Sequence, residues 1–560
     1  MATPPTRLKP WSVELDRDIE SGAAIQLRSP EPGVVTFWAP WDSSPLPMWF
    51  HFRIRGAKGW TVRFVLMNAN RCLGGEKSYA DLRVRPVVTE DPPTARPSKR
   101  RWRRVSAGHL SYDGESGRFS FTVRIRSDEA YVAHCYPYGL AEWNELARDL
   151  RRHKGVAVGV LGATEKGRPM PLASITDGRP DGRKVIWLTA RHHSGETPGS
   201  WALEGTLRWI LSNDPSARRL RKRYLVRVVP FADLDGVVEG FYGKERAPLD
   251  FNRAYLEDTP RPEIELILRE VLGFSRRNVA FFDYHAPGAG GPHQVFMKTK
   301  GATSTWRREL CWEYGRALLD ASPPRSKLAA KNLEEPLYQG DESETTSTGG
   351  VYLSTGILTM TNEVSYALTA DNHVLTRRDY LAYGAAIGRA VSKVLEAHAD
   401  EIEARGLIER EEERTPFAEY SGTAFRGGFQ WVPARQATFD SARDRSGEIL
   451  GVMLQGDTAF VHLACPRGKM GKRRTLQLDY RFLSDAKEGA LAGQATLFYY
   501  GKRGLRFRRE AKLTLDIRRG KKWRAYRVDL DPPKGARTVR LSLCLRGGPG
   551  RLELRPLVLR

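Results

Sequence analysis

Cysteine is scarce in this chain, and the few cysteines are scattered. The 560 residues contain five of them, with no Cys-x-x-Cys pair. Neither a disulfide framework nor a cysteine-based zinc knuckle is therefore expected, and a reducing compartment is favoured. The sequence also lacks an apolar segment near its start and any run of about 18 apolar residues. We therefore expect a cytoplasmic protein without a membrane span.

Acidic residues are sparse in the last quarter of the chain. Residues 416–560 carry 30 Lys+Arg against 13 Asp+Glu, a net charge of +17, and the remaining residues carry only +7 of the total of +24. A region with this excess of positive charge can attract an acidic protein or polymer. A basic face that only contacts solvent would have the same composition. Nucleic acid is a less favoured partner. We assign any electrostatic partner mainly to this region.

Residues 1–148 are expected to form an antiparallel β-sandwich. Segments such as MWFHFRIRG, WTVRFVLMN and GRFSFTVRIR alternate apolar and polar residues and are rich in aromatic and β-branched types. The segment TEDPPTARPSKRRWRR is rich in proline and then in basic residues, which predicts a solvated loop. We expect this domain to brace the one that follows and to help shape its cleft.

Strands and helices alternate over residues 149–408. The apolar run KVIWLTA indicates a buried parallel strand and PGSWALEGTLRWILS a helix, and YLVRVVPFAD, NVAFFDYHA and GILTMTNEVSY indicate further strands. This alternation predicts an α/β domain with a mixed sheet.

Residues 416–560 follow the charged linker REEERTP. They contain short alternating segments such as TAFVHLAC, TLQLDYRFL and TVRLSLCLRG, separated by turn signals. We expect a C-terminal β-sandwich of the jelly-roll type, which makes three domains in all.

Polar side chains gather where strands of the α/β domain end. RHHSGET follows KVIWLTA, YHAPGAGG closes one strand and NEVSY closes another, and together they supply His193, Glu196, His285 and Glu363. Ligands of open α/β sheets bind beyond the carboxyl ends of the strands. Two histidines, a carboxylate and a free glutamate are the parts of a hydrolytic zinc centre. A His-x-x-Glu pair on its own is weak evidence, because histidines in loops are more often surface groups than metal ligands.

Taken in order, these segments resemble the zinc carboxypeptidase family, and specifically its cytosolic-carboxypeptidase-like branch. ARHHSGETPGSW is similar to the family's ligand loop with its tryptophan-bearing helix, and DLDGVVEGFYGKERAPLDFNRAY to its Asp-Gly-Val … Asp-x-Asn-Arg segment. FFDYHAPG is similar to the segment with the second histidine ligand, and TMTNEVSY to the strand with the general base. Upstream, WFHFRIRGAKGWTVRFVLMNANR and AYVAHCYPYGLAEW resemble the β-sandwich that precedes the peptidase domain in this branch.

The resemblance implies a metal site and a base. His193, Glu196 and His285 would bind one zinc ion, and Glu363 would be the general base that acts on a zinc-activated water. The family tolerates other residues at the position of His192, and we expect His192 to shape the rim of the site.

The resemblance also implies residues that hold the substrate. Asp250 matches an aspartate that orients a ligand histidine, and Asn252 and Arg253 match the pair that grips the terminal carboxylate. An arginine that stabilises the oxyanion is expected as well, but a gapless alignment places a glycine there. We predict Arg246 in this role, with nearby Lys244 as the alternative.

Two features of the family are poorly matched. A tyrosine that caps the bound terminus is expected upstream of the base strand, where Tyr352 and Tyr338 are the candidates. The stretch ETTSTGGVYLSTG, expected to line the pocket for the last side chain, contains no Lys or Arg. The sequence therefore does not favour removal of glutamate over that of a small, polar or aromatic residue.

The hypothesis from the sequence is a zinc-dependent metallocarboxypeptidase that hydrolyses a C-terminal or side-chain-branched peptide bond. Its substrate would be a peptide or protein C-terminus. An amidohydrolase acting on a small N-acyl amino acid is one alternative. A catalytically silent protein that binds carboxylate-ended peptides or acidic polymers is another.

Overall fold

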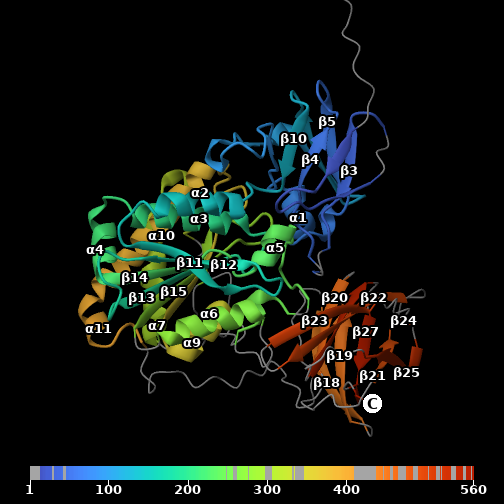
Figure 1. Cartoon of the computed structure of the whole chain (residues 1–560). Coiled ribbons are helices and arrows are strands. Elements are labelled where there is room, and N and C mark those ends of the chain that lie inside the picture. The colour runs from blue at the N-terminus through green and yellow to red at the C-terminus, as the bar shows by residue number, and fades with distance from the viewer. Residues whose placement is uncertain are drawn as a thin grey trace, which may run out of the picture. The chain divides into compact units, whose positions relative to one another are not determined.

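The structure is a computed structural model of the 560-residue chain (Figure 1). It describes residues 13–27, 31–41, 44, 46–247, 249–255, 261–274, 277–296, 305–330, 333, 346–408, 437–444, 447–454, 458–464, 475–483, 490–501, 504–511, 517–518, 520–530, 538–546, 550–555 and 558–559. The chain divides into two compact units. One comprises Met1–Asp42, Leu46–Lys244 and Leu266–Arg414, and the other Ser43–Pro45, Glu245–Glu265 and Thr415–Arg560. The division into three domains stays a prediction.

Two five-stranded sheets form the N-terminal region of the first unit. Their orders are β1(Glu14–Asp16)-β4(His51–Arg55)-β10(Glu129–Ala133)-β6(Val87–Thr89)-β7(Arg103–Arg104) and β2(Ile25–Gln26)-β3(Val34–Trp38)-β5(Thr61–Leu66)-β9(Arg118–Arg124)-β8(Leu110–Asp113). Phe52 of the first sheet lies 5.0 Å from Phe37 and 6.0 Å from Phe64 of the second, measured between ring centroids. All three rings are buried, so aromatic side chains join the two sheets. The expectation of a wholly antiparallel arrangement is wrong in one place, because β3 and β5 pair in parallel.

A mixed seven-stranded sheet forms the centre of the first unit, as predicted. Its order is β11(Val156–Ala163)-β12(Pro169–Ile175)-β14(Tyr224–Val229)-β13(Lys184–Ala190)-β15(Asn278–His285)-β17(Leu358–Glu363)-β16(Gln294–Val295). The four inner strands β14, β13, β15 and β17 run parallel to one another. Nearly all their side chains are buried, which explains the continuous apolar runs in the sequence.

Helices cover the central sheet on both sides. Figure 1 shows α3 (Thr197–Ile210) on one side and α6 (Pro262–Gly273) on the other. The closing helix α10 (Arg377–Ala397) packs against α3 so tightly that a Cβ atom at Gly384 would lie 1.9 Å from the Ala202 carbonyl oxygen. The other described helices are α1 (Gly75–Ala80), α2 (Leu140–Leu150), α4 (Pro215–Arg223), α5 (Leu234–Glu239), α7 (Thr305–Ala321), α9 (Ser347–Thr355) and α11 (Ala399–Ala404).

Two antiparallel sheets form the C-terminal region. One has the order β18(Ala437–Asp444)-β19(Gly447–Leu454)-β27(Gly550–Leu554)-β21(Thr475–Leu483)-β25(Gly520–Asp529), with β28(Val558–Leu559) beside β21. The other has the order β20(Thr458–Ala464)-β26(Thr538–Arg546)-β22(Ala490–Gly501)-β23(Gly504–Ala511), with β24(Ile517–Arg518) beside β22. The basic motif RGKMGKRR lies outside the described residues.

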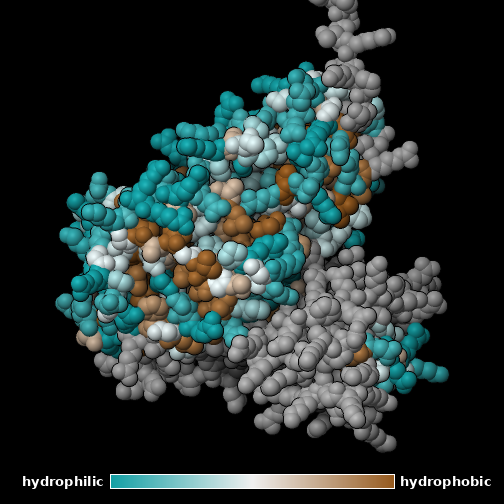
Figure 2. All heavy atoms as spheres, viewed as in Figure 1, coloured by the Kyte–Doolittle hydropathy of each residue, from teal (hydrophilic) through white to brown (hydrophobic). Residues whose placement is uncertain are grey.

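The surface of the first unit is mostly hydrophilic on the face shown in Figure 2, with smaller apolar areas over the central domain. The edge strand β11 contributes an exposed apolar residue, because Val160 is 60% exposed. Among the described helices, none combines the length and the apolar character that a membrane span requires.

Arg104 of β7 links the N-terminal sheets to the central domain. Its guanidinium donates hydrogen bonds to the Arg85 carbonyl (2.9 Å), the Tyr366 carbonyl (2.7 Å) and the Tyr380 hydroxyl (2.6 Å). The same group lies 4.6 Å from the centre of the Tyr136 ring. The basic segment that ends in this arginine was expected to be a solvated loop, and its last residue is a structural contact instead.

We expect Arg104→Met to lower the free energy of unfolding by about 3 kcal/mol, because several buried acceptors lose a charged donor. Urea denaturation measures this change. Arg101→Met is the matched control, because the Arg101 side chain is 89% exposed and pairs with Asp91 at the surface. Equal stability of the two variants would contradict a bracing role for Arg104.

Candidate active site

The loop between β13 and α3 carries the first group of predicted site residues. Arg191 begins the loop with a φ of 62°, a left-handed conformation that a non-glycine residue adopts only when its surroundings impose it. The buried Arg191 guanidinium donates hydrogen bonds to the Ser194 carbonyl (2.8 Å) and the Tyr138 carbonyl (2.6 Å). The first bond closes the loop on itself, and the second attaches it to the segment that precedes α2. The histidines of the loop are thus held in a rigid turn.

His193, Glu196 and His285 lie together at the carboxyl ends of β13 and β15. The two Glu196 carboxylate oxygens lie 2.9 Å from His193 Nδ1 and 2.8 Å from His285 Nδ1. Their possible ligand atoms all lie within 4.8 Å of one another, and the three side chains are buried. Two imidazole nitrogens and one carboxylate oxygen are the donor set that catalytic zinc uses, with a fourth position left for water or substrate. The residues therefore fit the metal that the sequence predicts.

The negative charge of Glu196 is stabilised by the basic side chains around it. Burial alone would raise the pKa of Glu196, but the two histidines and Lys244 hold it well below its usual value. The Lys244 ammonium lies 3.7 Å from the Glu196 carboxylate and is mostly buried. The structure therefore brings Lys244, the alternative to Arg246, close to the ligand cluster.

Glu363 ends the strand beside the one that carries His285. The parallel pairing of β15 and β17 places Glu363 directly opposite His285, and the Val364 amide donates to the His285 carbonyl at 2.9 Å. Glu363 is 5% exposed, and its Oε2 atom has no hydrogen-bond partner among the described residues. Burial raises the pKa of this carboxyl, and the negative charge of Glu196 raises it further. A carboxylate that is held close to the ligands, with one oxygen not bonded to any described residue, suits a general base.

Four predicted residues lie in the segment Glu245–Glu265, which groups with the second unit. Within that segment the buried Asp250 carboxylate accepts hydrogen bonds from the amides of Glu245 and Asn252, both at 2.6 Å. The guanidinium of Arg246 lies 5.9 Å from the Phe251 ring centre. The roles of Arg246, Asp250, Asn252 and Arg253 at the metal site stay predictions.

His192 does not shape the rim of the site, which corrects our expectation. It is fully buried, and its Nδ1 lies 3.0 Å from the carboxylate of Asp283. Sequence reasoning missed Asp283 as a partner of this histidine. The alternation of side chains along β15 was an available signal, because residues two apart on a strand share a face and Asp283 precedes His285 by two.

The stretch upstream of the base strand is helical and has a basic neighbour. Tyr352 lies in α9 and is 7% exposed, and the guanidinium of Arg307 lies 3.4 Å from its ring centre. Arg307 is buried, comes from α7 and donates a hydrogen bond to Thr359 of β17. Sequence reasoning missed this arginine because it lies far earlier in the chain. Tyr338, the other candidate for a capping residue, lies outside the described residues.

Comparison with protein families finds two matches. Residues 15–135 match the cytosolic carboxypeptidase N-terminal domain, and residues 144–258 match the zinc carboxypeptidase domain. Cytosolic carboxypeptidase 2 of Danio rerio is 29% identical over 285 residues, which are 44% of this chain and 37% of that protein. Cytosolic carboxypeptidase 1 of Mus musculus is 26% identical over 332 residues, 51% of this chain and 26% of that protein. The match thus spans less than two fifths of the length of either relative.

Among solved structures, a metallo-carboxypeptidase from Burkholderia cenocepacia has the same fold. It is superposed with a TM-score of 0.59 at 21% identity, over 69% of this chain and 100% of that chain. The ordered pair of sequence matches, this fold and the cluster of two histidines and a glutamate agree with one another. Residues 15–135 and 144–258 of this chain are thus similar to the N-terminal domain of cytosolic carboxypeptidases and to the zinc carboxypeptidase domain.

Proposed function

We propose that this chain is a zinc-dependent metallocarboxypeptidase that removes residues from the C-terminus, or from a side-chain branch, of a peptide or protein. The observation that carries this proposal is the buried cluster of His193, Glu196 and His285 with Glu363 beside it, whose Oε2 atom has no hydrogen-bond partner among the described residues. One zinc ion per chain would be held by the three clustered residues. When bound, zinc supplies a Lewis acid that acidifies water and polarises a carbonyl group.

The chain's own residues then have distinct tasks. Glu363 takes a proton from the attacking water and passes it to the leaving amine. Its Oε2 atom, which has no hydrogen-bond partner among the described residues, is available to carry this proton. Asn252 and Arg253 hold the terminal carboxylate of the substrate, and Asp250 orients a ligand histidine. Arg246 was predicted to stabilise the oxyanion, and the short distance from Lys244 to Glu196 supports Lys244 as a second cation for that task.

The preferred last residue of the substrate depends on the side chains that line its pocket. The buried Arg307 guanidinium lies 3.4 Å from the ring centre of Tyr352, which belongs to the stretch expected to line the pocket for the last side chain. This positive charge supports an acidic last residue in addition to the neutral ones that the pocket stretch suggests. We also propose a cytoplasmic location, a jelly-roll-like sandwich for residues 416–560, and an acidic protein or polymer as the partner of that basic region.

The decisive experiment compares peptides that differ only at their C-terminus. We expect release of the last residue from a peptide with a free carboxylate and no release from the same peptide with a C-terminal amide. A panel that varies the last two residues, including Glu and Asp, then identifies the preferred terminus. N-acetyl amino acids test the amidohydrolase alternative, because rapid hydrolysis of those alone would favour it. Binding of the free peptide without hydrolysis would favour the catalytically silent alternative.

A further inference from the structure

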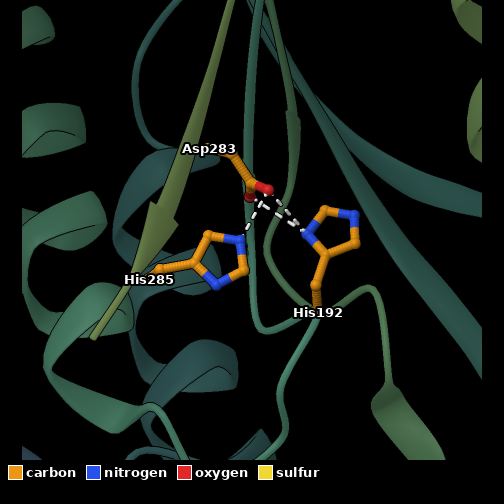
Figure 3. Close-up of side chains that lie close together, drawn as sticks. All are labelled: His192, Asp283 and His285. Carbon is orange, nitrogen blue, oxygen red and sulfur yellow. Dashed lines mark hydrogen bonds and ion pairs between the residues drawn. The ribbon is translucent and has the colours of Figure 1, made fainter. Parts of the chain in front are cut away.

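Asp283 is the centre of a buried hydrogen-bond network next to the proposed zinc ligands. Its carboxylate accepts hydrogen bonds from His285 Nε2 (2.8 Å), His192 Nδ1 (3.0 Å), the Thr189 hydroxyl (2.8 Å) and the Ser347 hydroxyl. Figure 3 shows the two imidazole rings on either side of this carboxylate. Asp283, His192 and Thr189 have no exposed surface. Four donors from three different segments therefore converge on one carboxylate.

The contact with Asp283 complements a metal bound on the other side of the His285 ring. Both ring nitrogens lie 2.8 Å from a carboxylate, Nε2 from Asp283 and Nδ1 from Glu196. A carboxylate oxygen only accepts, so a metal bound at Nδ1 beside Glu196 leaves the hydrogen atom of the ring on Nε2, where it is donated to Asp283. A carboxylate that holds a ligand histidine in this way fixes its tautomer and its ring orientation, and makes it a better ligand.

The bond to His192 extends this effect to the other side of the site. His192 is adjacent to the proposed ligand His193, on the loop that starts α3. One carboxylate therefore connects the ligand loop to the strand that carries His285. The rings of His192 and His285 are nearly parallel, with 5.7 Å between their centres.

The same residues also have the spacing of a second metal site. Ligand atoms of His192, Asp283 and His285 lie within 4.8 Å of one another. A metal there would need His285 to bind through both of its nitrogens, and it would compete with the hydroxyl groups that already donate to Asp283. The geometry is therefore that of a hydrogen-bonded carboxylate and not of a second metal centre.

We propose that Asp283 is a positioning residue for His285. We also propose that its bond to His192 holds the loop of His193 and Glu196 in place relative to β15, the strand that carries His285. This inference rests on the zinc site of the proposed function. It is independent of the predicted role of Asp250, which rests on the resemblance alone.

Asp283→Asn tests the inference through the affinity for zinc. The asparagine keeps the size of the side chain but loses the charge and one accepting oxygen, so we expect the dissociation constant for zinc to rise about 10- to 100-fold. Competition with a chelating dye measures this constant on the full-length protein. Visible absorption after substitution with cobalt reports on ligand geometry, and we expect it to change as well.

Asp235→Asn is the matched control. Asp235 is a buried carboxylate outside the site that accepts hydrogen bonds from the Thr164 hydroxyl (2.9 Å) and the Lys166 amide (3.1 Å). We expect it to lower stability in urea without changing the affinity for zinc. His192→Phe provides a second test if Asp283→Asn does not fold, with an expected loss of affinity of about threefold to tenfold.

The outcomes separate this inference from the proposed function. Wild-type affinity in Asp283→Asn, or in His192→Phe if that variant alone folds, would overturn the positioning role while leaving the zinc site intact. A wild-type protein that binds two zinc ions, one of which is lost in Asp283→Asn, would replace the positioning role with a second metal site. A wild-type protein that binds no zinc would overturn the proposed function and this inference together.

Discussion

Glu363→Gln is expected to lower the rate of peptide hydrolysis by about 10²- to 10⁴-fold, which is the usual contribution of a general base. Glutamine has nearly the same shape as glutamate but cannot accept the proton of water. Glu363 has no hydrogen bond through Oε2 to any described residue, so the substitution breaks no bond at that atom. We therefore expect the fold, the zinc content and the affinity for substrate to change little.

Steady-state kinetics and metal analysis of the same preparation check this prediction. The expected result is a large fall in kcat with about one zinc ion per chain retained. A variant that keeps most of its activity would show that another group acts as the base. A variant that has lost its zinc would show that Glu363 contributes to the metal site itself.

Glu196→Ala is expected to abolish both zinc binding and hydrolysis. Glu196 is the only residue of the cluster that contacts both histidines, and its carboxylate also accepts a hydrogen bond from the Ala286 amide at 3.1 Å. Its removal deletes one of three ligands and leaves two buried imidazoles without their shared negative charge. The zinc content should fall to near zero after dialysis, and activity should fall below detection.

Glu204→Ala is the control for this experiment. Glu204 lies in α3, the helix that begins directly after Glu196; it is also buried and forms an ion pair with Arg208 at 2.7 Å. We expect it to retain zinc and activity with some loss of stability. Retention of zinc by Glu196→Ala would contradict the assignment of Glu196 as a ligand.

The elements that carry the site could be predicted from the sequence because their patterns are local. KVIWLTA is a continuous apolar run, and the structure has it as the buried strand β13. The ordered motifs around His193, Glu196, His285 and Glu363 then identified residues from three separate segments that the fold brings close together. The parallel pairing of inner strands makes such convergence at their carboxyl ends predictable.

Contacts between distant side chains could not be predicted in the same way. His192 was expected at the rim because spacing identified only its neighbour as a ligand, and its bond to Asp283 depends on how β13 and β15 pair. Arg307 was missed because only the packing of α7 against β17 brings it near Tyr352. The parallel pairing of β3 with β5 was likewise missed, because alternation along a strand does not specify the direction of its partner.

The residues proposed for catalysis and those expected to select the substrate lie in different parts of the chain around β15 and β17. His285 and Glu363 are fixed opposite each other by the pairing of their strands, and a shift of one residue in β17 would turn Glu363 to the other face. Residues 286–357 connect the two strands and include the stretch expected to contact the last residue of the substrate. Insertions and substitutions there leave the register unchanged. We therefore expect relatives to diverge in this connection while hydrolysing the same kind of bond, and an engineer to alter specificity there first.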